Sequence, residues 1–300
     1  MSLSVCCLTA DPGPQVAAAL GPLRHVADEI VIAADARVGA EDLTAYGAVA
    51  DRVLRVEFEY LERHLAWLHG ECTGDWVLRL DGDEVPSRAL VEALPGLVAS
   101  RDVVQYWLPR RWLWPDADHW IRELPWYPDM QLRLVRNDGT LRFPGELHTS
   151  ALPAWPAAYL DEPIYHLACA VTGVEARRGR ALRYELTAPG KRAPGGGPAN
   201  EVFYVPEDHA ARAPARVPDE DRALVASALG ASPAPPAGGE APPDAPIVRD
   251  TTEPAITADD RRASLELVDE GPPLRFEAGA SREVLVRVHN LGGVAWPWGG

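Results

Sequence analysis

Long hydrophobic runs and positive charge are both scarce in this 300-residue chain. No stretch of about eighteen consecutive apolar residues occurs, so we expect no membrane-spanning helix. The N-terminal segment MSLSVCCLTADPG lacks the basic start and the long apolar region of a signal peptide. We therefore expect a cytoplasmic protein, with peripheral contact at the inner face of a membrane as a further option.

Cysteine is scarce as well, and its spacing is not that of a metal-binding motif. The four cysteines are Cys6, Cys7, Cys72 and Cys169, and no CxxC pair occurs among them. Adjacent Cys6 and Cys7 cannot easily bridge each other, and a zinc site normally needs the closely spaced pairs that are missing here. We expect buried thiols in a reducing compartment.

Positive charge is outnumbered by negative charge. Lysine and arginine number 29 against 44 aspartates and glutamates, which gives a net charge of −15. Nucleic acid is therefore not an expected partner, because its phosphates would be repelled. A nucleotide could still bind where a metal ion or a local basic cluster offsets its phosphates.

In the first 87 residues, short apolar runs alternate with segments of helical period. The predicted strands are 3–8, 29–34, 51–58 and 75–80, and the predicted helices are 15–26, 40–50 and 60–74. Strands and helices that alternate through short links predict an α/β fold with a parallel, doubly wound sheet. The strands are apolar without interruption, which is typical of strands covered on both faces.

The pattern changes after residue 87. A helix over 89–99 is followed by predicted antiparallel strands over 103–114, 129–138 and 139–148, and then by a basic helix over 175–186.

Four segments follow from these patterns. We predict a main domain over 1–190, its extension over 191–229, a Pro/Ala/Gly-rich linker over 230–256, and the start of a β-sandwich over 257–300. Because about forty residues cannot complete a sandwich, we expect the sequence to be truncated there.

The segment GDWVLRLDGDEVPS, residues 74–87, ends a buried strand in three closely spaced carboxylates. Ligands of open α/β sheets bind beyond the carboxyl ends of the strands, where Asp35, Thr9 and Asp11 also fall. A divalent cation would offset the repulsion among these carboxylates, and oxygen ligands suit Mg²⁺ or Mn²⁺. The alternative is an acidic surface turn that caps the helix beginning near Ser87, with Glu84 as a cap or as a support for Asp83.

Three segments in order resemble the family 2 glycosyltransferases, which have the GT-A fold. GDWVLRLDGDE resembles their strand and DxD motif. WYPDMQLRLVRNDGTLRFPGELH and PIYHLACAVTGVEARRGRALRYE resemble the later segments of bacterial members related to lipopolysaccharide-core glycosyltransferases. The resemblance covers about residues 3–190 and implies a GT-A domain.

The resemblance also implies roles for the residues at the strand ends. Asp83 would hold the metal ion, with Asp81 assisting through the ribose or through a metal-bound water. Asp35 would contact the donor nucleotide, and Thr9 and Asp11 would lie against it at the end of the first strand.

An inverting transfer, which the resemblance implies, needs a carboxylate base opposite the leaving group. Glu146 in PGELH is the first candidate and Asp129 in YPDMQ the second. Relatives commonly carry a Glu directly after the His, where this chain has Thr149. His148 is a candidate ligand of the metal or the diphosphate, or a structural histidine.

The acceptor side is less defined by the sequence. Tryptophans between 107 and 126, including Trp126, could stack on a sugar or pack the join between the two halves. Gln131 and Arg133 share one face of a strand, where they would line or support an acceptor site. The basic run from Arg177 to Arg183 reads as a solvated helix face, or as a contact to phosphates or an anionic membrane.

The leading hypothesis is an enzyme that moves a sugar from a UDP-, GDP- or dTDP-sugar to a hydroxyl of a glycan, lipid-linked or protein acceptor. A nucleotidyltransferase is an alternative, although its usual basic loop is missing from LTADPGPQ. A carbohydrate-binding or scaffold protein on a decayed transferase fold is the other alternative.

Overall fold

A computed structural model describes most of the first 230 residues. The described ranges are 1–57, 61–139, 141–145, 149–187, 199–209 and 214–230, together with the backbone of strands 247–248, 263–267 and 286–290.

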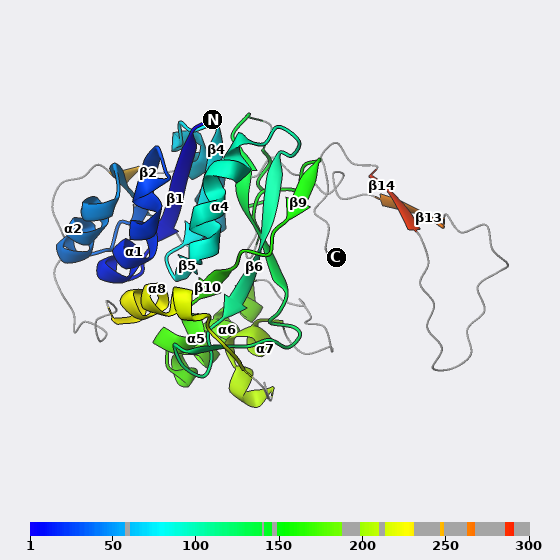
Figure 1. The fold of residues 1–300 in the computed structure, drawn as a ribbon. Helices are drawn as coiled ribbons and strands as arrows, with labels where there is room; N and C mark the ends of the chain where they lie inside the picture. Colours follow the sequence, from blue (N-terminus) through cyan, green and yellow to red (C-terminus); the bar gives the residue numbers. More distant parts are fainter. Residues whose placement is uncertain are drawn as a thin grey trace, which may run out of the picture.

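Ten strands of the described part form one mixed sheet, whose order is β12-β3-β2-β1-β4-β8-β6-β10-β5, with β9 paired to β6 (Figure 1). The strands are β1 Leu3–Thr9, β2 Glu29–Asp35, β3 Arg52–Val56, β4 Trp76–Asp81, β5 Glu84–Pro86, β6 Gln105–Trp112, β8 Asp129–Arg136, β9 Ala157–Tyr159, β10 Ile164–His166 and β12 Ile247–Val248. Strands β1 to β4 are mutually parallel, and β8 runs antiparallel to both β4 and β6. The predicted α/β class, with a parallel first half, is confirmed.

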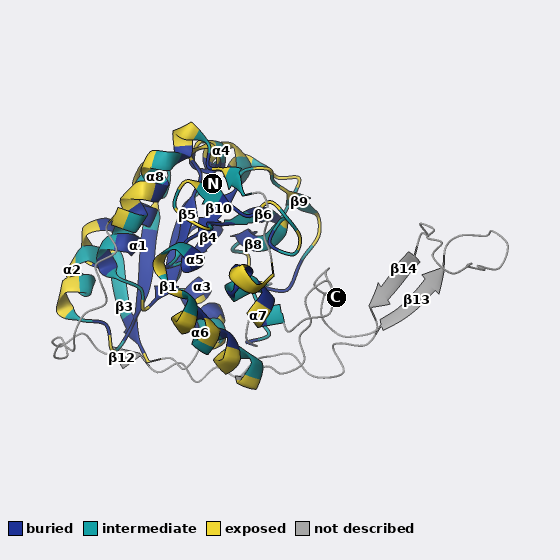
Figure 2. Ribbon diagram, turned by 90° about the horizontal axis from the view of Figure 1, so that it is seen from below, coloured by how far each residue is buried: buried dark blue, intermediate teal, exposed yellow. Residues whose placement is uncertain are grey.

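Helices cover both faces of the parallel strands because alternate side chains of each strand point to opposite faces. Val5 and Cys7 of β1 join a core with α1, α2 and α4, whereas Cys6 and Leu8 join a core with α3 on the other face. These helices are α1 Gly13–Leu20, α2 Ala40–Val49, α3 Leu65–Glu71 and α4 Arg88–Ala99, with 3-10 turns η1 Gly21–His25 and η2 Leu61–His64. Figure 2 shows the central strands buried and the outer helix faces exposed.

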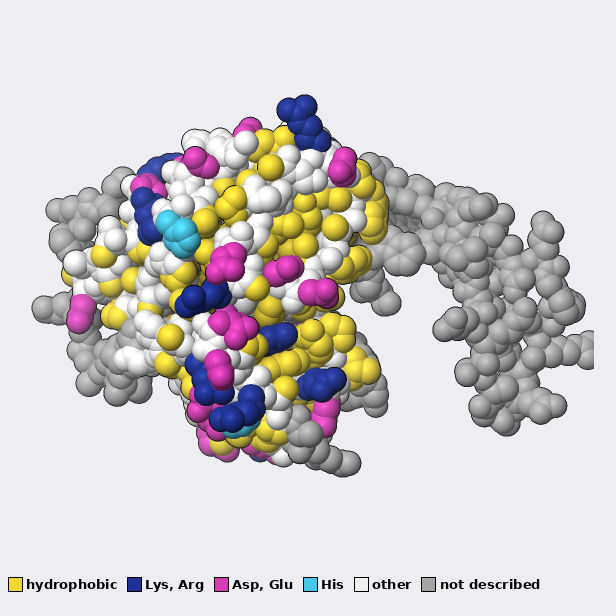
Figure 3. All heavy atoms as spheres, in the orientation of Figure 1, with side chains coloured by type: hydrophobic (Ala, Val, Ile, Leu, Met, Phe, Trp, Pro, Cys, Tyr) yellow, Lys and Arg dark blue, Asp and Glu magenta, His cyan; other side chains and the backbone are white. Residues whose placement is uncertain are grey.

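Of the later helices, α5 to α7 lie beside the second half of the sheet, whereas α8 packs against helices of the first half (Figure 1). They are α5 Ala168–Val171, α6 Val174–Thr187, α7 Ala199–Tyr204 and α8 Asp219–Gly230, with the 3-10 turn η3 Pro206–Asp208 and a small sheet of β7 His119–Trp120 and β11 Ala215–Arg216. Helix α8 packs on α1 and α4, and its Asp221 accepts hydrogen bonds from the Arg88 backbone and the Tyr165 hydroxyl. On the face drawn in Figure 3, acidic and basic side chains are interspersed.

Two local expectations differ from the structure. Residues 141–145 of the predicted strand over 139–148 are not a strand, although Gly139 has the positive φ of a turn. Conversely, Glu84–Pro86 forms the unexpected strand β5, antiparallel to β10. The cap of α4 is Ser87, whose Oγ accepts the Leu90 N–H at 3.1 Å, so Glu84 does not cap that helix.

Beyond residue 230 the structure describes three short strands. β12 lies within the predicted linker and pairs with the edge strand β3. β13 Ala263–Leu267 and β14 Val286–Asn290 pair antiparallel within the predicted sandwich segment. Among the helices of the described ranges, none has both the length and the apolar character needed to cross a bilayer.

The topology fixes where a ligand would bind. From β1 the chain moves outward through β2 and β3, and then returns to place β4 on the opposite side of β1. The order of strands therefore reverses between β1 and β4, and the crevice beyond their carboxyl ends is the expected ligand site. Thr9 ends β1 and Asp81 ends β4.

Two glycines test how tightly the first half is packed. A Cβ on Gly74 would lie 2.5 Å from the Ser4 backbone nitrogen, whereas a Cβ on Gly96 meets nothing within 4 Å. We predict that Gly74→Ala lowers the free energy of unfolding by about 1–3 kcal/mol. Gly96→Ala, in helix α4, should raise it by up to about 1 kcal/mol. Urea denaturation measures both, and equal effects would contradict this packing.

Candidate functional site

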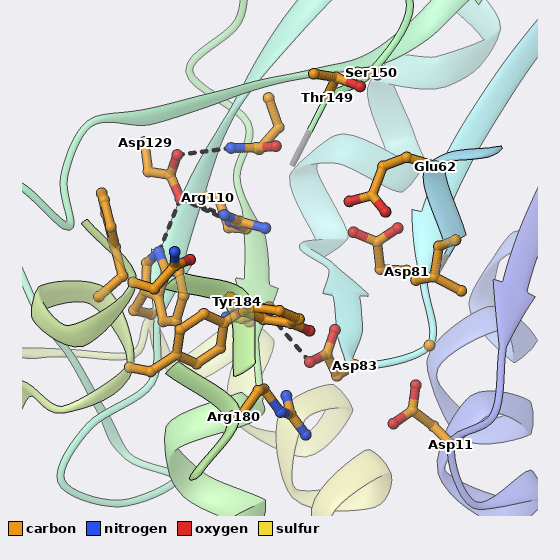
Figure 4. A pocket seen from close by; sticks show the side chains of 18 of the residues that line it. Asp11, Glu62, Asp81, Asp83, Arg110, Asp129, Thr149, Ser150, Arg180 and Tyr184 are labelled. Carbon is orange, nitrogen blue, oxygen red and sulfur yellow. Dashed lines mark hydrogen bonds and ion pairs between the residues drawn. The ribbon is translucent and has the colours of Figure 1, made fainter. Parts of the chain in front are cut away.

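A cavity of about 590 Å³ opens at the reversal point between β1 and β4 (Figure 4). Its walls come from the strand ends, from β6, β8 and β10 of the second half, and from helices α6 and α7. The lining residues are Thr9, Ala10, Asp11, Leu61, Glu62, Arg79, Asp81, Gly82, Asp83, Arg110, Trp112, Asp129, Gln131, Arg133, Thr149, Ser150, His166, Arg180, Arg183, Tyr184, Ala199, Asn200, Phe203 and Tyr204.

The acidic turn after β4 lies directly against the end of β1. A Cβ on Gly82 would lie 2.1 Å from Thr9 Oγ1 and 2.4 Å from an Asp11 carboxylate oxygen, so only glycine fits between Asp81 and Asp83. The buried Gln15 amide donates to the Gly82 carbonyl at 3.0 Å. This close approach brings Asp11 to the same end of the cavity as Asp83.

Asp11 and Asp83 differ in their electrostatic surroundings. Burial and the neighbouring Asp83 raise the pKa of Asp11 to about 7, against a hydrogen bond from Thr9. Burial acts to raise the pKa of Asp83 too, but His166 and then Arg180 outweigh it, and the net pKa lies well below the usual range. The His166 Nε2 atom lies 3.2 Å from Asp83 Oδ2. Asp83 is therefore the carboxylate that stays ionised.

Asp81 is held by arginines from two strands. Arg79 donates to Asp81 Oδ1 at 2.5 Å, and Arg133 donates to Oδ2 at 2.5 Å. The Asp81 backbone N–H donates to Glu84 at 3.1 Å. With both oxygens occupied, Asp81 is oriented by its neighbours and lies at the cavity wall.

Glu84 is the buried centre of this network. It is fully buried, and it accepts hydrogen bonds from Arg133 at 2.6 and 3.0 Å and from Arg110 at 3.2 Å. Burial and then Asp81 raise the pKa of Glu84 to about 8, against Arg110 and Arg79. Glu84 thus joins β5 to β6 and β8, a role that requires strand β5 and was not evident from the sequence.

Asp129, the second candidate base, has both oxygens occupied. Its Oδ2 accepts from Arg110 Nε at 2.8 Å and Trp112 Nε1 at 2.9 Å, and its Oδ1 accepts from Gln131 at 2.7 Å. The carboxylate therefore already accepts three hydrogen bonds from side chains of the second half. The geometry suits Asp129 to holding Arg110 and Gln131 at the cavity wall.

Some of the other predicted site residues line the cavity and others lie outside it. Asp35 is buried at the end of β2, outside the cavity lining, and is paired with Arg37 at 2.7 Å. Trp126 also lies outside the lining and is buried, with its indole N–H donating to the Phe203 carbonyl at 3.2 Å. Gln131 and Arg133 both line the cavity. Glu146 and His148 lie outside the described residues, although Thr149 lines the cavity.

The basic run on α6 divides into two pairs. Arg177 pairs with Glu207 and Arg178 with Asp208, both at 2.5 Å. Arg180 and Arg183 line the cavity instead. The interpretation of the basic run as a solvated helix face is therefore incomplete, because Arg180 and Arg183 lie at the cavity.

Sequence reasoning missed several further lining residues. Arg110 follows no acidic motif, and Asn200 and Tyr204 belong to α7, which was expected only as an extension. Glu62 enters through the 3-10 turn η2. No local pattern marks these residues, since tertiary packing alone brings them to the cavity.

A divalent cation fits one end of the cavity if a ligand supplies part of its coordination. Within the described ranges, no three His, Cys, Asp or Glu side chains are grouped to hold a metal on their own. Asp83 and Asp11 nevertheless offer oxygens whose mutual repulsion a cation would relieve. Mg²⁺ and Mn²⁺ are commonly held by one or two carboxylates together with substrate phosphates.

Comparisons with known proteins find only remote structural likeness. No protein-family model and no curated protein sequence matches the chain. Glucosyl-3-phosphoglycerate synthase from Mycobacterium tuberculosis, solved with Mn²⁺, uridine diphosphate and phosphoglyceric acid, is 17% identical over 38% of this chain and 44% of its own, with a TM-score of 0.30. The match thus spans less than half of that synthase.

Two other solved structures show similar likeness. S. aureus TarS, residues 1–349, is 14% identical over 77% of this chain and 80% of its own, with a TM-score of 0.40. CMP:2-keto-3-deoxy-manno-octonic acid synthetase with CTP is 11% identical over 46% of this chain and 75% of its own, with a TM-score of 0.31. At such scores the likeness carries no argument about activity.

The raised pKa of Asp11 predicts a pH effect on stability. Because the folded state keeps a proton at about pH 7 that an ordinary aspartate loses near 3.8, unfolding becomes easier as pH rises between these values. We predict that Asp11→Asn removes about 1–3 kcal/mol of this decline in the free energy of unfolding. Urea denaturation at about pH 4.5 and 7.5 without metal measures it, and parallel pH profiles for the two proteins would contradict the assignment.

Proposed function

We propose that this protein is a GT-A glycosyltransferase that moves a sugar from a nucleotide-sugar donor to a hydroxyl acceptor with the help of Mg²⁺ or Mn²⁺. The observation that carries the proposal is the cavity at the reversal point between β1 and β4, where Asp83 and Asp11 face arginines of the second half. A nucleoside diphosphate needs cations on both sides of its phosphates, and this cavity offers a carboxylate pair for a metal ion and guanidinium groups opposite.

In this proposal the first half of the sheet holds the donor. Thr9 and Asp11 lie at the end of β1, and Asp81 lies at the end of β4. Asp35 would act at the nucleotide end, from the end of β2. Asp83 and Asp11 would hold the metal ion, which supplies stabilisation of the negative charge on the leaving diphosphate.

The second half would hold the acceptor. Asp129, Arg110 and Gln131 form a hydrogen-bonded polar wall, and Phe203 stacks on Trp112 with ring centroids 5.6 Å apart beside it. Polar side chains can hydrogen-bond the hydroxyls of a sugar, and adjacent aromatic faces can stack on its ring. The proposed acceptor is a glycan, a lipid-linked molecule or a protein. The proposed family is the inverting family 2 glycosyltransferases of the lipopolysaccharide-core type, and the proposed location is the cytoplasm.

We propose Glu146 as the catalytic base. The geometry of Asp129 supports ranking Glu146 ahead of Asp129 for this role. The Asp129 carboxylate is engaged by Arg110, Trp112 and Gln131, so it serves better as a positioning group. Glu146 follows the described residue Gly145 and precedes Thr149, which lines the cavity.

The direct test is turnover. We predict that the protein with Mn²⁺ releases a nucleoside diphosphate from at least one of a panel of UDP-, GDP- and dTDP-sugars when acceptor sugars are supplied. Coupled detection of the diphosphate measures the release. Pyrophosphate release from nucleoside triphosphates would indicate a nucleotidyltransferase instead, and a lack of both turnover and metal-dependent nucleotide binding would favour a scaffold.

Asp83 is predicted to be the residue on which metal-dependent donor binding depends. Asp83→Asn should weaken Mn²⁺-dependent nucleoside diphosphate binding at least about tenfold, because a charged ligand of the cation is lost. The exposed Asp102→Asn serves as the matched control. Calorimetric titration measures both, and unchanged binding by Asp83→Asn would exclude it as the metal ligand.

The choice of base gives a separate prediction. Glu146→Gln should leave donor binding intact and lower kcat at least about a hundredfold, which is the usual contribution of a positioned base. Asp129→Asn should raise KM for the acceptor, because it releases Arg110 and Gln131 from the wall. If Glu146→Gln keeps its turnover, the base is another residue.

A further inference from the structure

Arg180 differs from the other arginines of the cavity in its pairing. Arg79 and Arg133 pair with Asp81, and Arg110 pairs with Asp129, each at 2.8 Å or less. In the part of the chain that the structure describes, Arg180 makes no hydrogen bond or ion pair, and its guanidinium lies 5.8 Å from the Tyr204 ring centroid. Asp83 acts on Arg180 through its charge but accepts no hydrogen bond from it, so the donors of this partly buried guanidinium are left for an anion from solution.

The position of Arg180 indicates where such an anion would lie. Helix α6 carries it on the wall that faces the acidic turn, and Figure 4 shows it on the same side of the cavity as Asp83 and Asp11. Tyr184 lies one turn further along α6 and also lines the cavity. An anion here would lie between the guanidinium and any cation held by the two carboxylates.

Other arginines of helix α6 are paired with carboxylates, whereas Arg180 forms no ion pair among the described residues. Arg177 and Arg178, on adjacent positions of the same helix, are neutralised by Glu207 and Asp208. Carboxylates of η3 therefore pair with Arg177 and Arg178, and among the described residues no ion pair joins η3 to Arg180. A cavity-facing guanidinium that makes no hydrogen bond among the described residues is available to bind an anion.

We infer that Arg180 binds the terminal phosphate of the donor's nucleoside diphosphate, opposite the metal ion. This inference rests on the proposed function, and it identifies Arg180 as the residue by which helix α6 contacts the donor. When the bond between sugar and phosphate breaks, negative charge grows on that phosphate oxygen, and a guanidinium stabilises it by charge-assisted hydrogen bonds. The wall thus supplies a second positive centre that comes from the later half of the chain.

Binding of diphosphates and monophosphates separates this role from a structural one. Wild-type protein with Mn²⁺ is titrated with UDP, GDP and dTDP and with the corresponding monophosphates. For the diphosphate that binds best, Arg180→Ala should lower the affinity at least about tenfold, while the affinity for the monophosphate changes less than about threefold. Arg180→Lys should recover part of the loss, since it restores the charge but not the fork of donors.

Controls keep the outcomes distinct. Arg178→Ala removes a guanidinium of the same helix that is paired outside the cavity, and both affinities should stay at the wild-type level. Thermal unfolding checks that each variant is folded, and Arg180→Gln replaces Arg180→Ala if the alanine variant unfolds. Equal loss of both affinities, or no loss of either, would overturn the role of Arg180 and leave the proposed function intact. If wild-type protein binds none of the nucleotides, both proposals fall.

Discussion

The contact between Glu84 and Arg133 is the constraint on which the site depends. Glu84 follows the acidic turn on the short strand β5, and Arg133 comes from β8 in the second half of the sheet. Both side chains are buried, and Arg133 also reaches Asp81. Because leaving the buried Arg133 guanidinium without acceptors is strongly unfavourable, its hydrogen bonds to Glu84 hold the acidic turn in one position relative to the second half.

The network around that pair divides the charges of the cavity into two groups. Asp81 and Asp129 in the wall, and the buried Glu84 behind it, are paired with arginines of β4, β6 and β8. Asp83, Asp11 and Arg180, which lie on the same side of the cavity (Figure 4), form no arginine–carboxylate ion pair among the described residues. These three groups are the ones suited to a cation and to phosphates.

The turn itself is shaped by a close approach that only glycine allows. Gly82 lets Thr9 and Asp11 of the β1 end contact the turn between Asp81 and Asp83. A DxD sequence is common by chance, but a central glycine that packs against the end of strand β1 is a specific geometric feature. It places carboxylates from two distant segments at one end of the cavity.

The sequence by itself determined the α/β class, the parallel first half and the cluster of Thr9, Asp11, Asp81 and Asp83 at the strand ends, because strand periodicity and the polarity of parallel strands are local properties. It did not show strand β5, the burial of Glu84 or the engagement of Asp129. It also left open which arginines of α6 face the cavity. These depend on strand pairing and helix docking between segments far apart in the chain, so only the tertiary structure decided them.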